Sequence, residues 1–138
     1  MKDLRWRLGY TLVSVVTVAV GLGARRALSG WTAKYLGVAL WSTLVYWLVL
    51  ACAPRLRPAR AFGVTVAISF AVELFQLTPI PYRLGQVSVL FQLVFGMFFS
   101  AWDLPVYVVG SALGAALHAL LPELKATTVE PLKLQPPG

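Results

Sequence analysis

A few carboxylate and amide side chains interrupt long apolar stretches of the chain, and these are the residues that could do chemistry. In FAVELFQLTP, residues 70–79, Glu73 and Gln76 follow Thr65 and Ser69 at intervals of four, four and three residues. Residues at these intervals lie on one face of a helix. An ionisable group inside a membrane span costs about 2.5–3.5 kcal/mol on insertion scales, so such a group usually faces the protein interior and has a function.

A second polar face occurs near the end of the last apolar stretch. Its residues, again at helical spacing, are Asp103, Tyr107, Gly110, Gly114 and His118. The two glycines form the GxxxG motif GSALG, which lets another helix backbone come close. We expect the two polar faces to pack together, which brings the two carboxylates to a similar depth. Because neighbouring carboxylates repel, we expect one to hold a proton, or a cation such as a ligand amine to lie between them.

Two interpretations of these polar residues are open. In the first, they wall a shallow pocket that opens to the outside of the membrane, formed by Glu73, Gln76, Asp103 and Tyr107. In the second, they only staple helices together through hydrogen bonds worth typically about 0.6 kcal/mol each. For Asp103, which precedes a proline by two residues, helix capping is a further structural explanation. His118 we expect to be interfacial or interhelical.

The elements that must position these residues follow from composition. The chain is 59% hydrophobic and 12% charged, about half the charged share of a soluble domain, so most of its surroundings should be lipid. A crossing helix needs about 20 apolar residues. The expected spans are residues 8–24, 35–53, 61–77 and 104–121. Residues 87–99 are too few to cross and are expected to be re-entrant or interfacial.

The predicted fold is therefore all-α: an integral membrane bundle of four transmembrane helices with a short re-entrant or interfacial helix before the last. Residues 1–121 form a single transmembrane domain, and residues 122–138 form a flexible, polar tail that contains prolines. The run 8–24 exceeds the usual apolar region of a signal peptide, about 7–15 residues, and is followed directly by two arginines. We expect it to be a retained first span.

The basic residues predict the orientation, because cytoplasmic loops carry the excess of Lys and Arg. Four crossings put eight of the 12 on the side of both termini: Lys2, Arg5, Arg7, Arg55, Arg57, Arg60, Lys125 and Lys133. The other side holds the remaining four: Arg25, Arg26, Lys34 and Arg83. Both termini are therefore expected in the cytoplasm. The net charge of +7 indicates membrane loops rather than nucleic-acid binding.

The sequence gives little support for catalysis or metal chemistry. It contains one His and one Cys, Cys52, too few for a structural metal site. It has no HExxH, GxSxG or P-loop motif. We expect no metal and no cofactor.

Longer motifs resemble a known family. VELFQL followed by FGMFFSAWDLPVYVVGSALG, together with YLGVALWSTLVYW at residues 35–47, resembles a family of small bacterial membrane proteins catalogued as domain of unknown function 2809. The resemblance extends over about residues 9–121. More distantly, a Glu-x-x-Gln helix followed by an Asp-initiated, Gly-rich helix is similar to the VanZ-like family, some members of which are linked to tolerance of glycopeptide antibiotics such as teicoplanin.

The resemblance implies a set of shared positions and two departures. The shared positions are Trp41, Glu73, Gln76, Asp103, Tyr107 and Gly110. It implies that Trp41 joins the two glycines of the last span in helix packing. The family usually has an Asp where this chain has Val38 and an Arg where it has Gln86. If these form an ion pair in relatives, their joint loss is expected, because removing one partner leaves a costly buried charge.

The sequence favours a non-enzymatic protein of a bacterial inner membrane that binds a lipid, an envelope precursor or a small cationic group in the outward-facing pocket. Membrane lipids, and a membrane-protein partner or a second copy of the chain, are the expected partners, and nucleic acid is not. One alternative is an accessory subunit whose polar stripes and GSALG face pack against another membrane protein. The last is an enzyme that uses Glu73 and Asp103 as an acid–base pair on a lipid-linked substrate.

Overall fold

The computed structural model describes residues 2–120, and in this part the chain forms six helices and no strand. They are α1 Lys2–Ala27, α2 Gly30–Cys52, α3 Pro58–Phe75, α4 Ile80–Val87, α5 Val89–Phe95 and α6 Asp103–Leu120. The predicted all-α class is confirmed for these residues. The predicted tail, residues 122–138, lies outside the described residues.

Four of the helices, α1, α2, α3 and α6, are long and apolar enough to cross a membrane. They coincide with the four predicted spans to within three residues at each end, except that α1 begins six residues before residue 8 and α2 five residues before residue 35. Prolines explain two of the helix starts: Pro58 is the first residue of α3 and Pro105 lies in the first turn of α6, where no backbone N–H is needed. Four such helices fit a multi-pass membrane protein.

The connection between α3 and α6 differs from the prediction. The two prolines of TPIP, interpreted from the sequence only as a stop to α3, also begin the short helix α4, because proline suits a first helical turn. The expected segment 87–99 is interrupted by Ser88, whose extended backbone ends α4 and whose hydroxyl accepts from Leu90 N at 3.2 Å to start α5. With seven residues, α5 spans about 10 Å and cannot cross a bilayer. Its re-entrant or interfacial depth stays a prediction.

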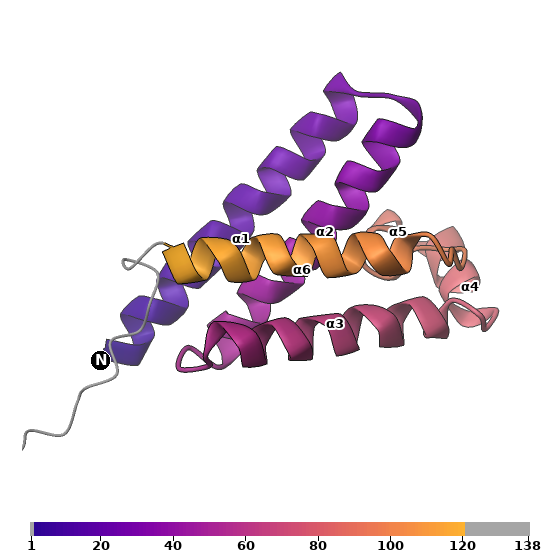
Figure 1. Cartoon of the computed structure of the whole chain (residues 1–138). Coiled ribbons are helices and arrows are strands. Elements are labelled where there is room, and N and C mark those ends of the chain that lie inside the picture. Colours follow the sequence, from indigo (N-terminus) through magenta and orange to yellow (C-terminus); the bar gives the residue numbers. More distant parts are fainter. Residues whose placement is uncertain (1, 121–138) are drawn as a thin grey trace, which may run out of the picture.

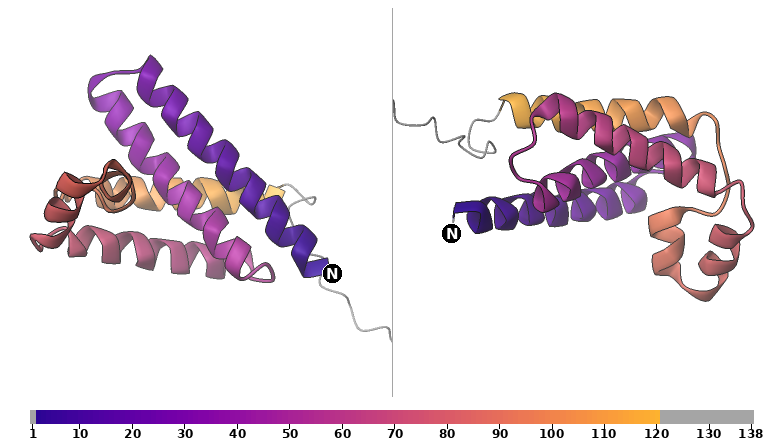
Figure 2. Two further views of the ribbon diagram at one scale, coloured as in Figure 1. Left: turned by 180° about the vertical axis from the view of Figure 1, so that it is seen from behind. Right: turned by 90° about the horizontal axis from the view of Figure 1, so that it is seen from below.

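The helices form two antiparallel pairs that cross obliquely (Figure 1). α1 and α2 make a hairpin, and α3 lies beside α6; α2 packs against both α6 and α3. The pairs meet where α2 ends and α3 begins, and the tip of the hairpin at residues 28–29 diverges from α4 and α5 (Figure 2). We call the end with residues 28–29 and 76–102 the carboxylate end, and the opposite end, with residues 53–57, the aromatic end.

The apolar core lies towards the aromatic end. Its buried residues are Tyr10, Tyr46, Trp47, Leu50 and Ala61. His118 belongs to the same region: it lies at 6.0 Å, ring centroid to centroid, from both Tyr10 and Tyr46, and its Nδ1 is 2.9 Å from Tyr46 Oη. The histidine is thus interhelical, one of the two roles expected from the sequence.

Many of the buried side chains are polar, whereas the outer surface is largely apolar. The buried polar residues are Ser14, Ser42, Thr43, Thr65, Ser69, Glu73, Asp103, Ser111 and His118. The exposed side chains of α1 include a run of leucines and valines, as expected of helices surrounded by lipid. Trp31 and Trp102, exposed by 73% and 74%, lie at the carboxylate end, where they suit the headgroup level of a bilayer.

Candidate functional site

Glu73 lies fully buried on α3, on the helix face predicted from the spacing of Thr65 and Ser69, which are also fully buried. Its Oε2 accepts from the hydroxyl of Tyr107 on α6 at 2.9 Å. Its Oε1 accepts a short hydrogen bond from the backbone N–H of Ser100. The predicted facing of the two polar stripes is therefore present, and the carboxylate joins α3, α6 and the loop before α6.

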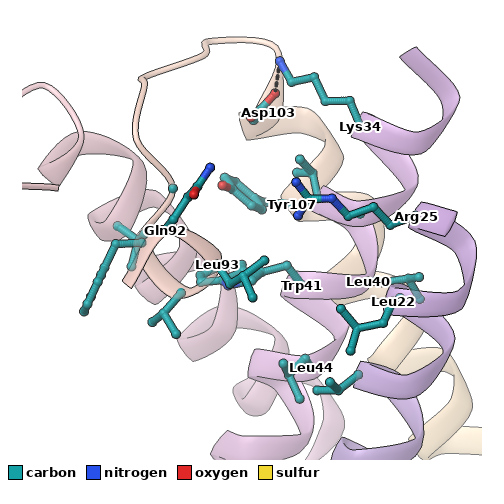
Figure 3. Close-up of a pocket in the computed structure, with 18 of the residues that line it drawn as sticks. Leu22, Arg25, Lys34, Leu40, Trp41, Leu44, Gln92, Leu93, Asp103 and Tyr107 are labelled. Carbon is teal, nitrogen blue, oxygen red and sulfur yellow. Dashed lines mark ion pairs between the residues drawn. The ribbon is translucent and has the colours of Figure 1, made fainter. Parts of the chain in front are cut away.

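Asp103 begins α6 and is 7% exposed. Its Oδ1 lies 3.3 Å from Nζ of Lys34 on α2, an ion-pair contact that lacks hydrogen-bond geometry. The same ammonium donates to Ser100 Oγ at 3.3 Å. No capping hydrogen bond from Asp103 occurs within residues 2–120; its side chain is turned to Lys34 (Figure 3).

The sequence led us to expect a held proton, or a cation between the two carboxylates, but in the structure each carboxylate has its own partners. Glu73 has two donors of its own, and Asp103 has the charge of Lys34. Both sets of contacts include Ser100, so the acids lie in one region but have separate partners. A ligand cation is therefore not needed to balance this pair.

Gln76, at the end of α3, holds α5 in place. Its Nε2 donates to the carbonyl oxygen of Phe95 at 2.7 Å, at the last residue of α5. Gly96 follows with a φ of +67°, and an added Cβ there would lie 2.6 Å from the same Nε2. Only glycine combines that backbone angle with so close an amide. The buried Oε1 of Gln76 has no hydrogen-bond partner within residues 2–120.

The two glycines of GSALG pack against α2. A Cβ on Gly110 would overlap the carbonyl oxygen of Ala39 and the hydroxyl of Ser42, and one on Gly114 would lie 2.8 Å from the Tyr46 ring. Thr43 adds a hydrogen bond of 2.8 Å to the carbonyl oxygen of Gly110. The close backbone approach that GxxxG predicts is thus made within the chain, between α2 and α6.

A cavity of about 640 Å³ opens between the diverging hairpin and α5, within the range of about 300–1,000 Å³ usual for ligand sites. Three predicted pocket residues, Gln76, Asp103 and Tyr107, line it; Glu73 does not, because it lies behind Tyr107. Trp41 also lines it and packs on Tyr107, with ring centroids 5.4 Å apart.

The cavity has a polar end and an apolar wall (Figure 3). Arg25 from α1 and Gln92 from α5 point into the space from opposite sides, below the pair of Lys34 and Asp103. Farther from the carboxylate end the walls are apolar: Val18, Leu22, Leu40, Leu44 and Leu93. A second cavity of about 580 Å³ adjoins the polar end and shares its charged residues.

Sequence reasoning missed Arg25, Lys34 and Gln92 as site residues. The two cations were assigned only to topology, as members of the basic minority on the outer side. That minority was itself a signal, because basic residues kept on the disfavoured side of a membrane call for another explanation. Gln92 carried no signal in the sequence, because the position of α5 across the cavity from α1 could not be predicted from spacing alone.

No group of three or more potential metal ligands exists among residues 2–120. The two positions that depart from the family pattern differ in their relation to the cavity. Val38 lines it, whereas Gln86 is exposed on α4 and is not among the lining residues.

Fold and site together fit a small multi-pass helical membrane protein with a cavity at one end of the bundle. By sequence, the chain belongs to the family described as Protein of unknown function (DUF2809), which it matches over residues 27–111. This match is narrower than the range 9–121 expected from the motifs, but it includes Lys34, Glu73 and Asp103. No curated protein and no solved structure matches the chain.

Proposed function

We propose that this protein binds an amphipathic membrane molecule, a lipid or a lipid-linked envelope precursor, in the cavity between the hairpin and α5. The observation that carries the proposal is the order of the lining: charged residues at the carboxylate end, then an apolar wall along α1 and α2. A molecule with a polar head at the membrane surface and a chain in the bilayer has the same order.

The small cationic ligand considered from the sequence is less well supported than an amphipathic one. The charged residues that line the two cavities are Arg25, Lys34 and Asp103, two positive and one negative. A cation would have to compete with Lys34 for Asp103 and would lie close to Arg25. Charge therefore favours a ligand with a neutral or acidic head.

The accessory-subunit and enzyme interpretations each depend on an arrangement that differs from the one in the structure. The accessory-subunit interpretation relied on polar stripes and a GSALG face free for a partner, and these are buried within the bundle. The enzyme interpretation needs both carboxylates at the substrate, but Glu73 is behind Tyr107 and outside the cavity lining.

We further propose a bacterial inner membrane with both termini in the cytoplasm, which the charge asymmetry of eight basic residues against four supports. The cavity then opens at the outer leaflet. The distant similarity to the VanZ-like family, carried by Glu73, Gln76 and Asp103, agrees with a ligand taken from the cell envelope.

The test is native mass spectrometry after mild extraction, with a cavity-filling variant. Gly37 lines the cavity and a Cβ there meets nothing within 4 Å, so Gly37→Leu should fill the space without a clash. Gly63 on α3 also has nothing within 4 Å but is not among the lining residues, so Gly63→Leu is the matched control.

The wild-type protein and Gly63→Leu should retain a bound lipid-like mass, and Gly37→Leu should lose most of it. A wild-type protein without any such mass, or equal retention in both variants, would contradict the proposal.

A further inference from the structure

The charged groups of the cavity are unequally engaged. Lys34 is held by Asp103 and Ser100, each at 3.3 Å. Arg25, in the last turn of α1, makes no hydrogen bond or ion pair within residues 2–120, although its side chain points into the cavity (Figure 3). Arg25 is exposed, so its five N–H donors, which have no partner among residues 2–120, are open to solvent or to a ligand in the cavity.

The next residue shows that this placement is specific. Arg26 has the same charge and lies in the same helical turn, yet it lines neither cavity, whereas Arg25 lines both. General attraction to the membrane surface would involve both arginines about equally. Only Arg25 of the two is placed to contact a ligand in the cavity.

Besides the carboxylate of Asp103, the polar groups that line the cavity with Arg25 include further donors. Gln92 faces it from α5 with an amide, and the ammonium of Lys34 borders the same space. A guanidinium and an ammonium that line the same cavity are both suited to phosphate oxygens, which accept several charge-assisted hydrogen bonds at once.

The apolar wall starts directly below these donors. Leu22 lies one turn before Arg25 on α1 and Val18 a further turn away, so the wall extends about 10 Å along the helix towards the membrane interior. Leu40 and Leu44 continue it on α2. A soluble phosphate compound would leave this wall empty, whereas an acyl or prenyl chain would cover it.

We infer that the cavity is a site for an anionic phospholipid, whose headgroup carries a phosphate and no compensating cation; Arg25 and Lys34 bind the phosphate, and the chain lies along Leu22, Leu40 and Leu44. The inference rests on the proposed function and names its ligand class. In the unliganded protein Asp103 holds Lys34, and a bound phosphate competes with Asp103 for that ammonium.

This arrangement predicts effects of opposite sign. Arg25→Gln removes the unpaired cation and should weaken binding of an anionic phospholipid relative to a zwitterionic one by about fivefold, the effect expected for one basic residue near a lipid headgroup. Asp103→Asn frees Lys34 while keeping the side-chain shape, and should strengthen the same preference. Arg26→Gln should leave it unchanged.

The experiment presents each protein with equal amounts of phosphatidylglycerol and phosphatidylcholine in mixed micelles and counts the bound lipids by native mass spectrometry. A third arm adds soluble glycerol phosphate, which should not displace the bound lipid, since it cannot cover the apolar wall. Thermal unfolding of each variant shows whether it is folded.

The results separate the two proposals. If the wild-type protein retains both lipids equally, the cavity binds lipid but the inferred preference for an anionic phospholipid is wrong. Equal effects of Arg25→Gln and Arg26→Gln, a weaker preference in folded Asp103→Asn, or displacement by glycerol phosphate would also overturn it. If no lipid is retained at all, the proposed function itself fails.

Discussion

At the scale of single residues, the buried carboxylate Glu73 makes the kind of interhelical hydrogen bond that the second interpretation of the polar residues expected. Its two oxygens are acceptors for the Ser100 N–H and the Tyr107 hydroxyl. A buried ionised group without partners would be very unfavourable, whereas hydrogen bonds to a charged acceptor contribute about 1.5–3 kcal/mol. Glu73 therefore fixes the loop before α6 and, through Tyr107, one wall of the cavity.

Replacing Glu73 with leucine tests this role. The Ser100 N–H and the Tyr107 hydroxyl would both lose their acceptor, so we expect the free energy of unfolding in detergent to fall by about 2–4 kcal/mol. Glu73→Gln keeps one oxygen acceptor and should cost less. It should also reduce lipid retention while membrane insertion stays complete, because the cavity wall is repositioned.

Thermal unfolding and the inserted fraction in membrane preparations measure these effects, with Tyr107→Phe as the variant that removes one bond only. Wild-type stability in Glu73→Leu would show that the two hydrogen bonds do not anchor the loop.

At the scale of elements, the contact between α2 and α6 sets how the two helix pairs cross. Gly110 allows the α6 backbone to meet the carbonyl of Ala39, and Thr43 secures the contact with a hydrogen bond. A side chain at this point would force the helices apart, since packed interiors have no space to absorb it.

Gly110→Ala should therefore lower the free energy of unfolding by about 1–3 kcal/mol, despite the better helix propensity of alanine. Gly63→Ala is the matched control, because its Cβ meets nothing within 4 Å and the change should be neutral or slightly stabilising. Chemical or thermal unfolding in the same detergent gives both values. Equal stability of the two variants would mean that α2 and α6 are not closely packed at Gly110.

The second element-scale prediction concerns α5, which Gln76 ties to α3 through the carbonyl of Phe95. Gln76→Leu removes this bond, worth about 1 kcal/mol, so the segment 88–99 should open more often. Hydrogen exchange of its amides should accelerate about fivefold, whereas Gln86→Leu, at an exposed site on α4, should have no effect. Unchanged hydrogen exchange in Gln76→Leu would show that contacts other than this hydrogen bond hold α5 in position.

At the scale of the whole molecule, the two ends of the bundle differ: one is closely packed and the other holds the cavity. Aromatic side chains and the tyrosine–histidine hydrogen bond hold the helices together at the aromatic end. The hairpin diverges from α5 at the carboxylate end and leaves the cavity there (Figures 1 and 3). One end thus supplies stability that the open end lacks.

Cys52 tests the orientation of the molecule. It is exposed at the last residue of α2, at the aromatic end, which the proposed topology puts in the cytoplasm. A membrane-impermeant thiol reagent should label it in broken cells and not in intact ones. Ser29→Cys in a Cys52→Ser background, at the hairpin tip, should show labelling in intact cells. Labelling of Cys52 from outside would reverse the orientation and the leaflet of the cavity.

The sequence determined the four long helices and the polar faces of α3 and α6, because these depend on local composition and on the helical repeat. The burial of Thr65, Ser69 and Glu73 on one face follows from that repeat alone. The sequence also predicted the close helix approach at Gly110, because two glycines four residues apart let another helix backbone come near inside a membrane.

Only the tertiary structure decided what the polar groups contact. Lys34 and Asp103 are 69 residues apart in the chain, and their pairing depends on the crossing of two helix pairs. One of the two partners of Glu73 is the backbone N–H of Ser100, a group that every residue type except proline offers and that no sequence pattern marks. The cavity arises because the hairpin tip diverges from α5, and that divergence is set by side-chain packing across the whole bundle, which helical periodicity does not encode.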